Sequence, residues 1–535
     1  MRLFTAALFL SAAAAAVQPA FAQSTTDLAR IVDEGMNRSH AMLDASELMD
    51  RIGPRLTNSP NIHRAEDWAV AKFQSFGLSN VHKEPFDFGR GWEIESSSVR
   101  MISPRVLQLT AIPVAWSPPT NGTIRAPIVL APINRKEQLA AYHGKLAGKI
   151  VLISLPGEGS EPKEPDFKRL SSEDIAKLDK YEQPKFDPTQ AAGFLKRIQL
   201  ARDIDAFLAQ EGAFAAVRIS YRDGKLLSGE GYDHQVGRTP KVPFIELAAE
   251  DYRRLARLAK TGEAPVLEIN SDVRFFDGDT HANNIIADIP GSDPKAGYVM
   301  AGAHFDSWAA GDGAADNGAG SIIVMEAARI LKQLGIRPKR TIRFALWEGE
   351  EQGLFGSLNY VNQHIARRQY QVGEDGIQNY TQWSTSYPIT PLPGYRDLKA
   401  YFNVDNGSGK LRGIYAEGNA GAVPLLHKWL EPFASMGAGT VVAAPTGGTD
   451  HVFFESVGIP GFQFIQDPLD YESRVHHSNI DTLDHVKADD MRQAAVVMAG
   501  MLLQAADSDQ VLPTLPVPSQ PVVTDPFKYD YPEPK

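Results

Sequence analysis

The middle of the chain carries histidine and carboxylate side chains at spacings that suit a metal site. His304 and Asp306 lie two residues apart, and Asp316 follows after a short glycine-rich run. The stretch before them, 297–303, is small and apolar enough for a buried strand, and 319–334 has the periodicity of a helix. His304 and Asp316 are therefore predicted at the carboxyl end of a strand, where open α/β sheets bind ligands.

Three more predicted strands run directly into acidic or histidine side chains. The strands and the groups that follow them are 341–347 with Glu350 and Glu351, 398–404 with Asp405, and 461–466 with His476 and His477. A single histidine at a strand end is more often a hydrogen-bonded structural residue, and a glutamate pair is more often a solvated face. The recurrence at successive strand ends favours one shared site.

A hydrolytic centre with two zinc ions needs a bridging carboxylate, a histidine and a carboxylate for each metal, and a free carboxylate base. The sequence offers one candidate for each role. The assignments are His304 and Asp405 for one zinc, Glu351 and His477 for the other, Asp316 as the bridge, Glu350 as the base that takes the proton from the bridging water, and Asp306 as the acceptor that fixes the tautomer of His304. Glu350 and Glu351 would repel each other unless a cation neutralised one of them.

Composition narrows the class of protein around this site. The 535 residues include 54 basic and 65 acidic side chains, a formal charge of −11, and no concentrated Lys/Arg run, which gives a nucleic-acid or anionic-membrane surface little support. With 43% hydrophobic residues and a mean hydropathy of −0.25, the chain is ordinary globular material, long enough for two domains. There are no cysteines, so a transition-metal site must use His, Asp and Glu.

The two ends of the chain carry their own signals. A charged start, the apolar run 3–17 and the small residues before Gln23 predict a secretory signal peptide over residues 1–22 and export to the periplasm or the medium. A membrane anchor is the alternative, but the apolar run is shorter than the roughly 20 residues that a spanning helix needs. The proline-rich stretch 508–535 predicts an extended tail without a core of its own.

Between the ends we expect a discontinuous main domain, 23–115 and 272–507, interrupted by an inserted domain over 116–271. Turn residues between 113 and 122 mark the first boundary, and short apolar strands with a helix at 249–258 fill the insert. The charged segment 161–185 is expected to be a solvated excursion. The insert carries no His/Asp/Glu cluster, so it is expected to cover the site without supplying a metal ligand.

The motifs resemble those of the zinc aminopeptidase family called M28. The matching segments, in order, are His304-x-Asp306, Asp316-Asn317, Glu350-Glu351-x-Gly353-Leu354, Asn403-x-Asp405 and His477-Ser478-x-x-Asp481. Within the family, the chain is similar to the plasma glutamate carboxypeptidase-like secreted dipeptidases, which share the His476-His477 pair where many relatives have Tyr-His. The insert resembles the protease-associated domain of this family.

The resemblance implies a fold, a cofactor and an activity. The fold is a three-layer α/β/α exopeptidase domain with a mixed sheet and a β-rich insert, and the cofactor is two Zn²⁺. The same metal ligands and base carry over through the motifs, together with a cis peptide between Asp316 and Asn317. The tyrosine that relatives place before the last ligand histidine donates to the oxyanion. Here that position is His476, which either replaces the donor or is a spacer.

The activity expected from the resemblance is that of an exported exopeptidase that removes an amino-terminal residue or splits dipeptides. A carboxypeptidase of the glutamate carboxypeptidase type is the near alternative, a one-zinc glutaminyl cyclase shares the fold, and a receptor-like peptide-binding module is the alternative without catalysis. Arg474 either pairs with a free substrate carboxylate or is a surface arginine. The sequence leaves open the side-chain preference, the native metal and a homodimer.

Overall fold

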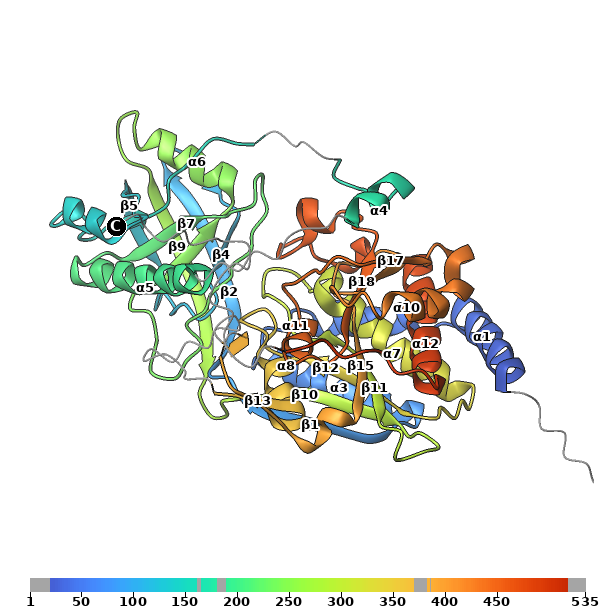
Figure 1. Ribbon diagram of the computed structural model, residues 1–535. Helices are drawn as coiled ribbons and strands as arrows, with labels where there is room; N and C mark the ends of the chain where they lie inside the picture. The colour runs from blue at the N-terminus through green and yellow to red at the C-terminus, as the bar shows by residue number, and fades with distance from the viewer. Residues whose placement is uncertain (1–19, 161–164, 180–188, 370–382, 385, 518–535) are drawn as a thin grey trace, which may run out of the picture.

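Two eight-stranded β-sheets organise the chain (Figure 1). The computed structural model describes residues 20–160, 165–179, 189–369, 383–384 and 386–517. The first sheet has the order β1-β10-β12-β11-β15-β18-β16-β17. Its strands are β1 (Ser79–Asp87), β10 (His281–Ile289), β11 (Tyr298–His304), β12 (Thr341–Trp347), β15 (Leu398–Asn403), β16 (Leu411–Tyr415), β17 (Thr440–Val442) and β18 (Gly461–Gln466).

The first sheet is mixed, as the family resemblance implies. Its central strands β12, β11, β15 and β18 run parallel to one another. On one side β10 and β1 are antiparallel, and on the other β16 is antiparallel to β18. The carboxyl ends of the four parallel strands therefore meet at one edge, which is the edge that the sequence assigned to the metal site.

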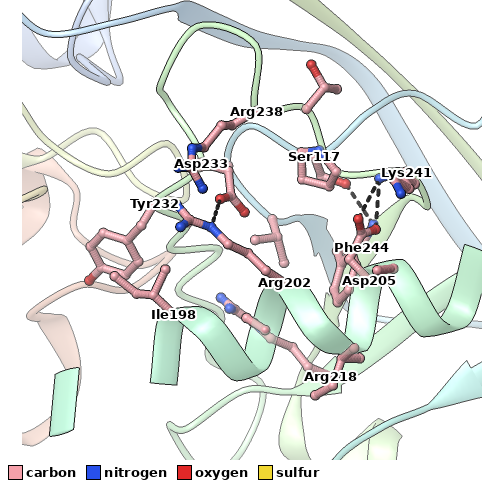
Figure 2. Close-up of a pocket in the computed structure, with 18 of the residues that line it drawn as sticks. Ser117, Ile198, Arg202, Asp205, Arg218, Tyr232, Asp233, Arg238, Lys241 and Phe244 are labelled. Carbon is pink, nitrogen blue, oxygen red and sulfur yellow. Dashed lines mark hydrogen bonds and ion pairs between the residues drawn. The ribbon is translucent and has the colours of Figure 1, made fainter. Parts of the chain in front are cut away.

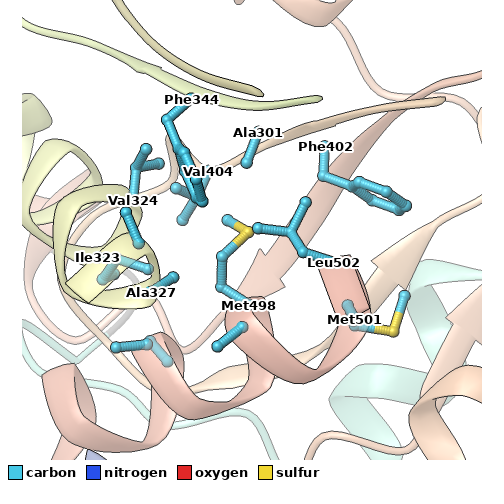
Figure 3. Close-up of a cluster of buried hydrophobic side chains, with 14 of the residues drawn as sticks. Ala301, Ile323, Val324, Ala327, Phe344, Phe402, Val404, Met498, Met501 and Leu502 are labelled. Atoms are coloured by element: carbon cyan, nitrogen blue, oxygen red, sulfur yellow. The ribbon is translucent and has the colours of Figure 1, made fainter. Parts of the chain in front are cut away.

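Helices cover both faces of this sheet, because alternate residues of the buried strands point to opposite sides. One face packs against helices α1 (Ala20–Asn37), α2 (Ala41–Ser46), α3 (Pro60–Phe76), α7 (Ala319–Gln333), α10 (Val423–Leu430) and α12 (Ala488–Asp507). Figure 3 shows Met498 and Leu502 of α12 beside Phe402 of β15 in this core. The other face packs against the shorter helices α8 (Phe355–Tyr360) and α11 (His451–Ser456). The result is the expected three-layer arrangement.

The second sheet has the order β3-β2-β9-β5-β6-β7-β8-β4. Its strands are β2 (Gly91–Ser103), β3 (Leu107–Gln108), β4 (Ala111–Pro113), β5 (Ile124–Leu130), β6 (Ile150–Leu152), β7 (Ala215–Ile219), β8 (Phe244–Leu247) and β9 (Val266–Phe276). Helices α5 (Thr189–Gln210) and α6 (Ala249–Leu258) accompany it. Two further antiparallel strands, β13 (Ala366–Arg368) and β14 (Ile389–Pro391), form a small separate ribbon.

The predicted limits of the insert, 116–271, are too narrow. Strands β2, β3 and β4, which the sequence placed in the main domain, belong to the second sheet, and β9 runs on to Phe276. The reason is the long antiparallel pairing of β2 with β9, from Gly91 opposite Phe276 to Ser103 opposite Val266. The turn residues at 113–122 lie inside this sheet and do not mark its boundary. We call residues 91–276 the insert from here on.

The described part of the charged segment is mostly exposed, as expected of a solvated excursion, and a few of its residues contact the main domain. Helix α4 (Ser172–Leu178) lies near β17 and β18 in Figure 1. Just before it, Arg169 pairs with the buried carboxylates of Asp467 and Asp490 at 3.1 and 2.8 Å. Leu170 N donates to Asp467 Oδ1 at 2.9 Å. These contacts fix the insert to the edge of the first sheet.

An apolar cluster joins the insert to the main domain. Trp92 and Trp116 of the insert are fully buried beside Trp308 and Phe355 of the main domain. The indole of Trp116 donates to Arg90 O at 2.8 Å, so its polar atom is satisfied inside the cluster. Buried aromatic side chains contribute much of the packing energy at such contacts. The insert is therefore held against the metal-site face of the main domain.

The ends of the described chain lie against the main domain. The predicted signal peptide falls almost wholly on residues outside the described part. At the other end, Leu512 is buried, Leu515 N donates to Gly458 O at 3.0 Å, and Asn419 donates to Pro513 O at 2.7 Å. The first part of the proline-rich tail is thus extended, as expected, and docked. Among the described residues, no helix combines the length and apolarity needed to cross a membrane.

Candidate metal centre

Four strand ends bring the predicted ligands together. His304 is the last residue of β11, Asp405 lies two residues beyond β15, and Glu351 lies four residues beyond β12. His304 Nε2 is 3.3 Å from Asp316 Oδ1 and 3.4 Å from Asp405 Oδ1. His477 Nε2 is 3.4 Å from Asp316 Oδ2 and 2.9 Å from Glu351 Oε2. Asp316 therefore faces one histidine with each of its oxygens, as a bridging carboxylate must.

These separations fit ligands that share a metal. Donor atoms about 2.0–2.1 Å from a tetrahedral zinc lie roughly 3.3–3.4 Å from one another. Three of the four separations between the histidine nitrogens and carboxylate oxygens lie at 3.3–3.4 Å. A cavity of about 10 Å³, the size of one water or ion, adjoins Asp316, Glu351 and His477. Nitrogen and oxygen donors in this arrangement suit Zn²⁺.

Buried carboxylate oxygens without hydrogen bonds also indicate a metal site. Asp316 Oδ2, Glu351 Oε1 and Asp405 Oδ1 are buried and accept no hydrogen bond. Within the part of the chain that the structure describes, no lysine or arginine pairs with these three carboxylates. Burying carboxylates without partners is costly, so they require cations. Burial raises the pKa of Glu351 to about 7 in the absence of such a cation.

Backbone contacts hold the bridging aspartate in place. The peptide between Asp316 and Asn317 is cis, as the family resemblance implies. The carboxylate of Asp481 accepts hydrogen bonds from Ala315 N at 2.6 Å and Asp316 N at 3.0 Å. The amide of Asn317 donates to Val404 O at 2.9 Å, which ties the bridge to the end of β15. Asp481 thus positions Asp316 from the loop that also carries His477.

A buried arginine supports the loop between His304 and Asp316. The guanidinium of Arg55 donates to Phe305 O at 2.8 Å, Asp312 O at 2.7 Å and Gly313 O at 2.8 Å. Burial lowers its pKa to about 10, so it stays charged at neutral pH. Arg55 is not among the site residues predicted from the sequence. Its role depends on carbonyls some 250 residues away in the chain, which no local pattern reveals.

The role predicted for Asp306 needs correction. His304 Nδ1 is 3.0 Å from the backbone oxygen of Asp306, whereas the nearer carboxylate oxygen is 3.7 Å away. The carboxylate instead accepts from Glu350 N at 3.2 Å and Glu351 N at 3.3 Å. Because the side chain is turned toward these amides, the main chain fixes the tautomer of His304. The carboxylate of Asp306 orients the turn that carries the two glutamates.

The predicted base stands beside the ligands and is the more exposed glutamate of the pair. Glu350 is partly exposed, whereas Glu351 is buried. Burial raises the pKa of Glu350 well above its ordinary value; the charge of His304 opposes the shift, and Asp405 adds to it. Glu350 therefore interacts electrostatically with the His304–Asp405 side of the centre. None of the described residues forms a hydrogen bond or ion pair with its carboxylate, which leaves the carboxylate available for proton transfer.

His476 lies over the centre. Its ring stacks on His477 with centroids 3.7 Å apart, and its Nε2 is 3.7 Å from Asp316 Oδ2. On the other side of the ring, Arg222 of the insert lies 3.2 Å from Nδ1 and donates to His476 O at 2.6 Å. A guanidinium can only donate, so Nδ1 accepts and the proton of the neutral ring is on Nε2. The ring thus presents an N–H toward the bridging aspartate.

Arg474, the predicted carboxylate-binding residue, does not join this group of side chains. Its guanidinium pairs with Asp470 at 3.0 Å, and 45% of the side chain is exposed. Asp470 also accepts from His485 Nδ1 at 2.7 Å. Contact with a substrate carboxylate would compete with the Asp470 pair, and this role of Arg474 stays a prediction.

Glu230 is a site residue that the sequence did not single out. It comes from the insert, and its Oε1 is 2.9 Å from His477 Nδ1. Although burial opposes it, the hydrogen bond and charge of His477 lower the pKa of Glu230 to about 2, so the carboxylate is ionised. A carboxylate on the far nitrogen of a ligand histidine fixes its tautomer and raises its basicity. Glu230 follows no strand-end pattern, and 247 residues separate it from its partner.

Glu230 also lines a cavity of about 380 Å³ inside the insert. Figure 2 shows Arg202 and Asp233 paired within it, and Tyr232 along its edge. The ring of Tyr232 meets Trp308 edge-on at 5.7 Å, and Trp308 meets His477 in the same manner at 6.2 Å. The wall between this cavity and the metal centre is therefore built from residues of both domains.

Comparison with known proteins supports the reading of the motifs. The model of the family described as "Peptidase family M28" matches residues 284–502, which contain every predicted metal ligand. Carboxypeptidase Q from Homo sapiens is 28% identical over 90% of this chain and 88% of that protein. The similarity therefore extends over the insert as well as the main domain.

Solved structures share the fold. A peptidase M28 precursor from Shewanella amazonensis superposes with a TM-score of 0.65 at 23% identity, over 93% of this chain and 99% of that one. A zinc aminopeptidase from Bacillus subtilis superposes with a TM-score of 0.55 at 19% identity, over 89% and 97% of the two chains. At these identities the likeness concerns the fold alone.

Proposed function

Since the chain is a zinc metallopeptidase with a peptidase family M28 domain, we propose that it is an exported exopeptidase with two zinc ions, acting on dipeptides and short peptides. The observation that carries the proposal is the convergence of the five ligands around Asp316, itself one of them, with one histidine on each of its oxygens. His304 and Asp405 would hold one ion, Glu351 and His477 the other, and Asp316 would join them.

The residues around the ions divide the chemistry. Bound zinc polarises the scissile carbonyl and activates water. Glu350 takes the proton from the attacking water and passes it to the leaving amine, because its carboxylate has no competing partner among the described residues. His476 donates its Nε2–H to the oxygen that becomes negative as the water attacks.

The insert completes the site in this proposal. Glu230 holds His477 in the tautomer that leaves Nε2 free to bind metal. Arg222 holds His476, and Tyr232 lies against Trp308 at the edge of the centre. We expect these insert residues to limit the room for a long substrate chain. The arrangement favours substrates with a free end close to the scissile bond.

Which end of the substrate is recognised is a separate part of the proposal. The dipeptidase and aminopeptidase reading rests on the resemblance of the motifs. A carboxypeptidase is the second candidate, because the relative that matches over most of the chain is called carboxypeptidase Q. A dipeptide has both ends free and satisfies either reading.

The deciding experiment uses the purified zinc-loaded chain and one tripeptide with three different residues. Mass spectrometry of early products shows whether the first or the last residue is released. The same tripeptide with an acetylated amino end, and with an amidated carboxyl end, shows which free end is needed. A third form of the tripeptide carries both modifications. If it is cleaved as fast as the unmodified tripeptide, the enzyme is neither an aminopeptidase nor a carboxypeptidase.

Export is proposed on the sequence of residues 1–22. Expression of the complete chain in a bacterial host should yield a mature protein that begins at Gln23, outside the cytoplasm. Amino-terminal sequencing of the periplasmic and medium fractions tests this. Uncleaved protein confined to the membrane fraction would contradict it.

A further inference from the structure

A second group of potential metal ligands lies outside the centre described above. It consists of Glu417, His451 and Glu455, with one potential ligand atom from each residue all within 4.8 Å of one another. Glu417 follows β16, and the other two lie four residues apart on α11, which places them on one helix face. His451 Nε2 is 3.5 Å from Glu417 Oε1 and 4.0 Å from Glu455 Oε1.

Among the described residues, four buried polar atoms of this group have no hydrogen-bond partner, although Glu417 Oε2 accepts from Thr446 N at 2.6 Å. The side chains of His451 and Glu417 are 0% exposed, and that of Glu455 is 18% exposed. Both ring nitrogens of His451, and Oε1 of each glutamate, make no hydrogen bond. A buried imidazole with two unsatisfied nitrogens is costly, and such groups in native proteins call for a ligand.

Protons alone do not explain the arrangement. Without a cation, a glutamate in this buried position would hold a proton, because burial disfavours the charged carboxylate. A protonated glutamate would then donate to the neutral ring at about 2.7–3.0 Å. The observed separations of 3.5 and 4.0 Å are too long for such bonds and leave room for an ion between the three side chains.

We propose that Glu417, His451 and Glu455 bind a further divalent transition-metal ion of the Zn²⁺ type, separate from the catalytic centre. Two carboxylates balance the charge of the ion, and among the described residues no lysine or arginine pairs with either of them. One imidazole with two carboxylates suits zinc, whereas calcium requires six to eight oxygen ligands.

The ion would tie α11 to the end of β16 behind the catalytic centre. Asp450, next to His451, accepts a hydrogen bond from Ser357. The neighbouring Thr449 accepts from the amide of Asn403, which lies two residues before the ligand Asp405. A structural ion at this position stabilises the loop that supports Asp405.

The test compares zinc content in the full-length chain loaded with Zn²⁺ and freed of excess metal. Glu455→Gln keeps the size of the side chain and removes its charge, and Glu431→Gln is the control at an exposed glutamate. Elemental analysis should show one zinc fewer per chain in Glu455→Gln than in the wild type, and no loss in Glu431→Gln. Equal zinc content in the wild type and Glu455→Gln would overturn the proposal.

A second measurement keeps the test decisive if Glu455→Gln does not fold. Anomalous diffraction at the zinc edge from wild-type crystals should give a peak between Glu417, His451 and Glu455. The same map shows the occupancy at His304 and His477 independently, so failure of this site and failure of the catalytic assignment are distinguished. No peak between the three side chains in zinc-loaded crystals would overturn the proposal.

Discussion

At the scale of single residues, Glu350 and Glu351 are adjacent in sequence but have different surroundings. Glu351 is buried 2.9 Å from His477, while the carboxylate of Glu350 has no hydrogen-bond or ion-pair partner among the described residues. We therefore expect Glu350→Gln to keep its zinc and lose at least about 10²-fold in kcat. Glu351→Ala should lose zinc. Metal analysis beside kinetics checks both, and equal zinc loss in the two variants would contradict the division of roles.

His476 differs from the tyrosine expected by family resemblance, and its orientation allows a direct test of oxyanion donation. His476→Phe removes the N–H and should lower kcat by about 10²–10³-fold with zinc content unchanged. His476→Tyr restores a donor and should recover part of the rate. If His476→Phe has the wild-type kcat, the ring is a spacer held between Arg222 and His477.

Glu230 tests the contribution of the insert to metal binding. Glu230→Gln keeps the shape but replaces the ionised acceptor on His477 Nδ1, and we expect zinc affinity to fall by about 10–100-fold. Glu250→Gln, at an exposed position of the same insert, is the matched control. Competition with a chromogenic chelator measures both. Unchanged affinity in Glu230→Gln would assign the carboxylate a purely structural role.

At the scale of elements, the packing of α12 makes a prediction that opposes helix propensity. Alanine is favoured over glycine in helices by about 1 kcal/mol. A Cβ on Gly500 would overlap the ring of Phe433, which is fully buried. Gly500→Ala should therefore destabilise the chain by about 1–3 kcal/mol.

Gly193 on α5 is the matched control, because a Cβ there meets no atom within 4 Å, and Gly193→Ala should be neutral or stabilising. Urea unfolding measures both variants. Adding Phe433→Leu to Gly500→Ala replaces the ring with a smaller side chain and should restore part of the lost stability. A gain in stability for Gly500→Ala alone would show that α12 moves to make room.

The elements also show how far the sequence could predict this structure. The predicted strands 341–347 and 461–466 coincide with β12 and β18, and the helix 249–258 with α6, because each is strongly patterned and bounded by breaks. The carboxyl ends of the predicted strands also led to the metal ligands in the sequence. The edge of the insert was misplaced because pairing of β2 with β9 joins residues far apart in the chain. Glu230 was missed for the same reason.

At the scale of the whole molecule, the insert contacts the main domain on the catalytic face and at the edge of the first sheet. Trp92 and Trp116 anchor it through the buried cluster with Trp308, and Arg169 ties it to Asp467 on the opposite side. Contacts on both sides of the centre favour a fixed cover over a lid that opens for each substrate. Substrate size is then limited by the space between the insert and the metal ligands.

We therefore expect the rate of hydrolysis to fall steeply with substrate length, from dipeptides to an octapeptide. The internal bonds of a folded protein should not be cleaved. Arg222→Ala, which removes an insert side chain that contacts His476, should raise the relative rate on the octapeptide. Arg125→Ala, at an exposed ion pair on the far part of the insert, is the control and should leave the length profile unchanged. Mass spectrometry of products at equal substrate concentration gives the profile. If the wild type cleaves internal bonds of folded proteins as fast as dipeptides, the insert does not restrict access.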